Sequence, residues 1–203
     1  MTKNIRPYAT EGAWVSSHHF YYESAHKFRD EFKKILVTLS EEEEKLRSEN
    51  SDMGPEHIES FVCYKTDGLR EEAYRYATSS ILFACMTVEG LVNDYGTIRL
   101  GGDFYKRNLE RVGITEKLSL IILICIGVKL EKKDELFKRT RKLFDKRNSL
   151  VHPKTKEFDF RRSEDFITLH PSELSVEETI EDIEFIIERL NDMDPQIGLK
   201  MKI

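Results

Sequence analysis

Apolar residues recur along this chain with the period of an α-helix, and runs that alternate as a strand would are scarce. A first helix is predicted from about residue 16 to 47, with an apolar stripe that includes Phe32 and Leu39. A loop rich in polar residues and glycine is predicted over 47–56, before a second helix over about 68–100. The periodicity therefore favours a helical protein.

The second predicted helix is apolar on nearly all sides between Ile81 and Met86. Such a helix is surrounded by protein, which places it in the middle of a bundle. A short helix through Glu110 is expected next, followed by a buried helix over about 118–127 and a charged helix over 132–151. These elements require short connections and hence a compact bundle.

The last helix is predicted to begin at the capping box formed by Ser175 and Glu178. Its apolar positions follow at helical spacing, at Ile180, Ile183, Ile187 and Leu190. The sequence thus predicts a single all-α domain, a bundle of about five main helices over residues 16–193. Residues 1–15 would form an N-terminal extension and 194–203 a C-terminal tail.

The distribution of charged residues singles out one segment of the chain. The 203 residues carry a net charge of -5, which argues against a surface that coats nucleic acid indiscriminately. Residues 131–162 nevertheless contain twelve Lys and Arg against six Asp and Glu, a local charge of +6. One anion-facing zone is indicated, although a solvated helix face is the commoner meaning of a charge run.

Cysteine usage and hydropathy indicate a reducing cytoplasm and no membrane segment. Cys63, Cys85 and Cys125 show no paired spacing, and the last two lie within apolar runs as core residues would. The N-terminus lacks the apolar stretch of a secretory signal. The longest apolar run, 118–128, is shorter than the roughly 20 residues that span a bilayer.

An arginine lies on the apolar face of the 132–151 helix. At about 100° per residue, Arg147 falls at the centre of the arc that holds Leu143, Phe144 and Val151. An unpaired guanidinium is costly to bury, so Arg147 must pair with an internal carboxylate, face a cleft, or face a second chain across a symmetric interface. A buried Arg–Glu bridge is the commonest of these arrangements.

A histidine follows where this helix must stop. Pro153 disfavours helical backbone at the residue before it, so the helix is predicted to end at His152. Histidine exchanges a proton near neutral pH, and arginine offers a fork of donors to phosphate. Together they suit phosphodiester cleavage by internal transesterification. By itself, a terminal histidine before proline is more often a cap.

The residues RNSLVH, which are Arg147, Asn148 and, after three residues, His152, resemble the R-x4–6-H motif of the HEPN superfamily in its R-N-x-x-x-H form. The upstream stretch around Glu89 and Asn93 is similar to the central helix of that family, and places a HEPN-like core at about 68–152. The resemblance implies a metal-independent endoribonuclease that acts as a homodimer on RNA, with Arg147 and His152 as the catalytic pair and no cofactor. It also implies roles as a toxin or in anti-phage defence.

Supporting roles are predicted for several further residues. Asn148, Glu89 and Asn93 are predicted as polar support for the pair, and Glu89 is the carboxylate expected to satisfy Arg147, either as an orienting group or in a purely structural bridge. Contacts with the RNA backbone are predicted for the basic residues of the same helix, Lys138, Arg139, Arg141, Lys142 and Lys146. For any single one of them, an ordinary charged helix face is the commoner explanation. No metal site is predicted.

Two other functions remain open at this point. The bundle can be a non-catalytic interaction module, with Arg147 in a buried ion pair and His152 as a helix terminator. The resemblance would make its partner a nucleotidyltransferase antitoxin or another defence component. Alternatively, the same donors can bind a small nucleotide without hydrolysis. The position of Arg147 in the structure discriminates between a shared cleft and a sealed core.

Overall fold

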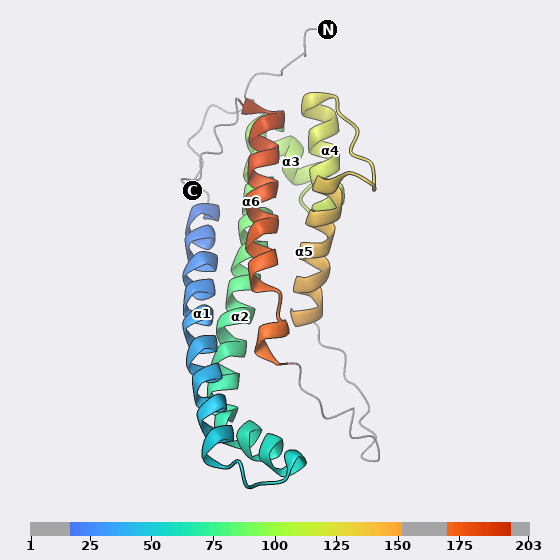
Figure 1. The fold of residues 1–203 in the computed structure, drawn as a ribbon. Helices are drawn as coiled ribbons and strands as arrows, with labels where there is room; N and C mark the ends of the chain where they lie inside the picture. Colours follow the sequence, from blue (N-terminus) through green and yellow to red (C-terminus); the bar gives the residue numbers. More distant parts are fainter. Residues whose placement is uncertain (1–16, 152–169, 196–203) are drawn as a thin grey trace.

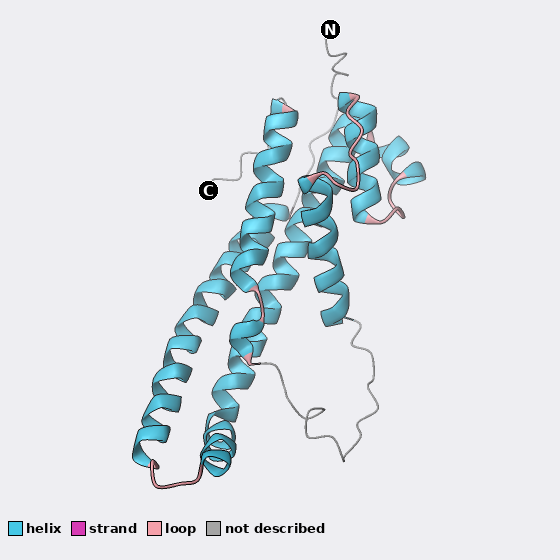
Figure 2. Cartoon of the chain, turned by 45° about the vertical axis from the view of Figure 1, so that its right-hand side comes forward, coloured by secondary structure: helices cyan, strands magenta, loops and turns pink. Residues whose placement is uncertain are grey.

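The computed structural model describes residues 17–151 and 170–195, and every regular element in these two ranges is helical (Figures 1 and 2). The helices, in chain order, are α1 (His18–Glu49), α2 (Pro55–Leu100), α3 (Gly102–Asn108), α4 (Ile114–Ile126), α5 (Glu135–Val151), η2 (Pro171–Glu173) and α6 (Val176–Met193). The prediction of a single all-α domain with about five main helices is confirmed, because α3 and the 3-10 turn η2 are short.

Helix α2 is the centre of the bundle. It contacts α1, α3, α4, α5 and α6, and Figure 1 shows α1 to the left of it, α6 in front of it, and α4 and α5 to the right. Helices α1 and α2 form a long hairpin whose closed end extends beyond the other helices (Figures 1 and 2). The buried positions Phe32 and Leu39 of α1 confirm the predicted stripe.

Helix α2 begins thirteen residues earlier than predicted. Pro55 occupies the first turn, where its fixed φ suits a helix and its missing N–H is not needed. The loop is consequently confined to residues 50–54. Gly68 lies inside the helix, and a Cβ built there would meet no atom within 4 Å, so this glycine neither ends the helix nor serves a close approach.

The central apolar stretch of α2 is buried on most but not all sides. Ile81, Ala84 and Cys85 are buried, as predicted, whereas Met86 is 39% exposed. Val151, expected on the buried stripe of α5, is 42% exposed at the end of this helix. Glu89 lies about one turn after Met86 on the same face of α2.

Helix α6 follows the predicted apolar spacing but lacks the predicted capping box. Ser175 is the N-cap residue, yet its side chain makes no capping hydrogen bond, and Glu178 forms ion pairs with Lys142 and Lys146 instead. The Glu178 carboxylate therefore joins α6 to α5 instead of capping the start of α6.

The bundle also includes Asp194, the first residue of the predicted tail. Asp194 is buried, with Oδ2 lying 3.2 Å from the Arg99 Nε and accepting a hydrogen bond of 3.3 Å from the Tyr95 hydroxyl. This ion pair fastens the end of α6 to α2. The extension 1–15, His152 and residues 196–203 lie outside the described residues. Across the described helices, none has the length and apolar character needed to cross a membrane.

Candidate functional site

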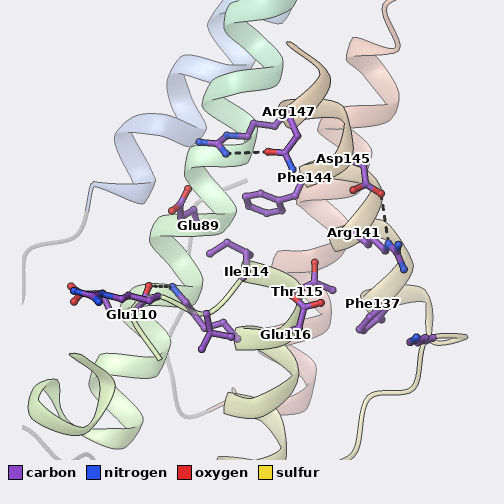
Figure 3. A pocket seen from close by; sticks show the side chains of 16 residues that line it. Glu89, Glu110, Ile114, Thr115, Glu116, Phe137, Arg141, Phe144, Asp145 and Arg147 are labelled. Carbon is purple, nitrogen blue, oxygen red and sulfur yellow. Dashed lines mark hydrogen bonds and ion pairs between the residues drawn. The ribbon is translucent and has the colours of Figure 1, made fainter. Parts of the chain in front are cut away.

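A cavity of about 530 Å³ lies between α5, the middle of α2, the α3–α4 turn and the first turn of α4 (Figure 3). Its volume falls within the range of small-ligand sites. Helix α5 contributes the side chains of Phe137, Arg141, Phe144, Arg147 and Asn148 to its wall. The face of α5 that the sequence singled out therefore borders an open pocket.

Arg147 reaches this pocket rather than a sealed core. It is half-buried, and its Nη1 donates a hydrogen bond of 3.2 Å to Oδ1 of Asn148. No acidic residue in the described ranges lies within ion-pair distance of it. Of the three arrangements predicted for Arg147, the cleft is the one found within a single chain. Arg147 also lies near the Cys85 thiol: burial raises the pKa of Cys85 to about 12, and Arg147 opposes that rise.

Glu89 shares the pocket with Arg147 but does not pair with it. Figure 3 shows Arg147 and Glu110 at opposite ends of the pocket, with Glu89 and Ile114 between them. Within the described part of the chain, the Glu89 carboxylate has no hydrogen bond or ion pair. Among the described contacts there is no bridge between Glu89 and Arg147, and the two residues line the same pocket.

Asn93 belongs to a hydrogen-bond network at the end of the pocket away from Arg147. Its Oδ1 accepts hydrogen bonds from Nζ of Lys117, at 2.9 Å, and from the hydroxyl of Tyr105, at 2.5 Å. The Lys117 ammonium donates two further bonds, of 3.0 Å to the Tyr105 hydroxyl and 3.3 Å to the Glu110 carbonyl oxygen. Asn93 thus supports Lys117 rather than the motif.

Lys117 is the residue of this site that the sequence analysis missed. It lines the pocket although it is only 3% exposed. Burial lowers the pKa of Lys117, and the nearby carboxylates of Glu89 and Glu110 oppose that shift. Burial is likewise the main cause that raises the pKa of Tyr105 to about 12. The signal was present in the sequence, since Lys117 shares the buried stripe of α4 with Ile121 and Cys125, four and eight residues on.

Two of the basic residues predicted to contact RNA, Arg139 and Lys142, hold α5 against α6. Arg139 Nη1 lies 3.2 Å from Oδ1 of Asp182, which is buried. Lys142 pairs with Glu178, and its Nζ lies 3.9 Å from Asp182 Oδ2. Burial raises the pKa of Asp182, and these two cations oppose the rise. An architectural role therefore accounts for Arg139 and Lys142.

The remaining basic residues of α5 differ in their surroundings. Lys146 donates a hydrogen bond of 2.9 Å to the Thr179 hydroxyl and is also held by α6. Arg141 lines the pocket and lies 3.7 Å from the exposed carboxylate of Asp145. Lys138 is exposed and makes no contact that would restrain its charge within the described ranges. Among the described residues, Arg141 and Lys138 are thus the two of these five basic residues that do not pair with α6.

No group of three or more His, Cys, Asp or Glu side chains in residues 17–151 and 170–195 is arranged to hold a metal ion. No protein-family model, curated protein or solved structure matches the chain significantly. The resemblance to the HEPN superfamily therefore stays a prediction. His152 lies just beyond the described end of α5, so the site described comprises the arginine half of the motif.

Proposed function

We propose that the chain is a metal-independent endoribonuclease whose reaction centre is the Arg147 end of the pocket. The observation that carries this proposal is the position of Arg147, which lies in an open cavity without a neutralising carboxylate among the described residues. A guanidinium in such a place offers its donors to an anion from solvent, and RNA phosphate fits that fork. The motif that resembles HEPN nucleases supplies the histidine.

The reaction would be internal transesterification. The ribose 2′-hydroxyl loses its proton to a base, and its oxygen forms a bond to the adjacent phosphorus. The bond from phosphorus to the 5′ oxygen breaks, and that oxygen takes a proton from an acid. Arg147 stabilises the charge on the phosphorane oxygens, and Asn148 orients the guanidinium through its 3.2 Å hydrogen bond. His152 moves a proton, and His152 of a second copy in a homodimer supplies the other transfer.

The charge distribution supports the same proposal. Arg141 lies one to two helical turns before Arg147 on the pocket face of α5, where it can contact a neighbouring phosphate. The biological setting we propose is that of a toxin or defence effector in the cytoplasm, with an antitoxin protein as a possible partner.

The test is incubation of purified full-length protein with RNA in excess chelator. The Arg147→Ala, His152→Ala double variant is expected to cleave at least about 100-fold more slowly. Arg75→Ala is the matched control, because Arg75 is exposed, pairs with Glu71 among the described residues and does not line the pocket. Equal cleavage by wild type and the double variant would show that the activity comes from elsewhere.

A second candidate function is nucleotide binding without cleavage. The enclosing walls of the 530 Å³ cavity favour it, since they come from three helices and a turn and suit a ligand the size of a nucleotide. Saturable binding of RNA or nucleotides that Arg147→Ala abolishes, with no cleavage by wild type, would establish this function in place of the first.

A further inference from the structure

The pocket has a second cation, Lys117, at the end opposite Arg147. Its ammonium is bound to the Glu110 carbonyl, and Figure 3 places Glu110 and Arg147 at the two ends of the cavity. Helix α4 supplies this cation and α5 supplies Arg147, so the two are positioned independently. The pocket therefore has one cationic side chain at each end, with the carboxylates of Glu89 and Glu110 also in its lining.

The acceptors around Lys117 are all uncharged. They are the amide oxygen of Asn93, the phenol oxygen of Tyr105 and the peptide oxygen of Glu110. No carboxylate of the described chain lies within ion-pair distance of Nζ. Buried charges in proteins are usually paired, because an isolated ammonium in a poorly solvated place is costly.

A purely structural role explains the hydrogen bonds of Lys117 but not its charge. The network ties together α2, α3 and the α3–α4 turn, which an uncharged donor could also do. The positive charge instead gains its complement when an anion enters the pocket that Lys117 lines. The carboxylates of Glu89 and Glu110 act on Lys117 at longer range and oppose the lowering of its pKa by burial.

The middle of the pocket has a different chemistry. Glu89 presents a carboxylate with no hydrogen-bond partner among the described residues, and the ring of Phe144 lies beside it in Figure 3. A free carboxylate accepts hydrogen bonds from hydroxyl groups and repels phosphate, while an aromatic ring packs against a sugar or a base. A nucleoside suits this position better than a third phosphate would.

We propose that the pocket binds one ribonucleotide unit that carries a phosphate on each side. One phosphate lies at Arg147, the ribose hydroxyls face Glu89, and the second phosphate lies toward Lys117. This inference rests on the proposed function for the choice of RNA as the ligand. The spacing is consistent with it, since Glu89 and Asn93, the acceptor of Lys117, are one helical turn apart, or about 6 Å.

The test measures calorimetric binding of adenosine 3′,5′-bisphosphate to full-length protein, beside adenosine 5′-monophosphate, adenosine 3′-monophosphate and pyrophosphate. Wild type is expected to bind the bisphosphate at least about tenfold more tightly than each of the others. Pyrophosphate controls for charge alone, because its phosphates are adjacent. The 2′-deoxy bisphosphate is expected to bind more weakly than the ribonucleotide, because it lacks the 2′-hydroxyl that would donate a hydrogen bond to Glu89.

Lys117→Gln removes the charge and retains a hydrogen-bond donor. It is expected to lower bisphosphate affinity to that of the monophosphates, and to leave affinity for the monophosphate that occupies the Arg147 end unchanged. Lys106→Gln is the matched control, because Lys106 is exposed on α3 and does not line the pocket. A collapsed pocket would lose both ligands, which separates the charge effect from misfolding.

Equal wild-type affinity for the bisphosphate and the monophosphates would overturn this inference, even if Lys117→Gln did not fold. So would an unchanged bisphosphate affinity in a folded Lys117→Gln variant. RNA cleavage combined with either result would leave the proposed nuclease intact. Tight bisphosphate binding without any RNA cleavage would instead retain the two-phosphate site and remove the nuclease.

Discussion

Two glycines of α2 are expected to respond in opposite ways to the same change. Gly96 packs so closely that a Cβ would lie 2.8 Å from the Ile121 Cδ1 and 2.8 Å from a ring carbon of Tyr105. Carbon atoms prefer about 3.5–4.0 Å, so the ring or α4 would have to move by roughly 1 Å. At Gly68 the added Cβ meets nothing within 4 Å.

The magnitudes follow from these distances. Gly68→Ala should stabilise the fold by about 0.5–1 kcal/mol, because alanine loses less backbone entropy in a helix. Gly96→Ala makes the same gain but overpacks the core, at a cost of about 1–3 kcal/mol. The free energies of unfolding of the two variants should therefore differ by about 1–3 kcal/mol, or roughly 2–12 °C in melting temperature for a chain of this size.

Urea denaturation monitored by circular dichroism would measure the free energy of unfolding of both variants. Gly96→Ala also displaces the Tyr105 ring, whose hydroxyl accepts from Lys117, so it should weaken bisphosphate binding as well. If Gly96→Ala proved as stable as Gly68→Ala, the close packing of α2 against α3 and α4 would be incorrect.

Two further changes test the ionised groups of α6. Asp194→Asn should destabilise the fold by about 3 kcal/mol, or roughly 6–12 °C, because it removes the charge of a buried carboxylate that pairs with Arg99. Exposed Asp192→Asn should have little effect in the same thermal melts. Burial raises the pKa of Asp182 in the folded state, so the stability it contributes is fully present below its unfolded pKa of about 3.9 and is lost as pH rises through the folded value. Wild type should therefore lose stability relative to Asp182→Asn as the pH rises above about 3.9, and a difference that stays constant as the pH rises would contradict the effect of burial.

Helical periodicity was sufficient to predict most of the fold. The apolar spacing of α6, at Ile180, Ile183, Ile187 and Leu190, is the spacing of its buried residues. The start of α2 was mispredicted because the local signals conflict. Gly68 suggested a boundary, whereas Pro55, which begins the helix, was assigned to the loop. Packing against α1 determines where α2 begins, and a local sequence pattern does not show this long-range contact.

The site was predictable only in part. Periodicity located Arg147 on the apolar face of α5, but the bundle opens at that level, so the same face borders a pocket. The partner predicted for Arg147 was wrong because sequence spacing on α2 fixes the face of Glu89 and not its distance from α5. Lys117 was missed because the apolar run that follows it resembles an ordinary core helix.

The ion pairs of α5 explain how an acidic protein can present a cationic pocket. The face of α5 toward α6 carries Arg139 and Lys142, and the carboxylates of Glu178 and Asp182 neutralise them. The opposite face carries Arg147, which no acidic residue of α6 neutralises. The basic residues of α5 are thus divided between a side that pairs with α6 and a side that lines the pocket. The pocket itself is lined by five cationic and four acidic side chains, so its positive charge is concentrated locally, at Arg147 and Lys117, and does not extend over the whole cavity.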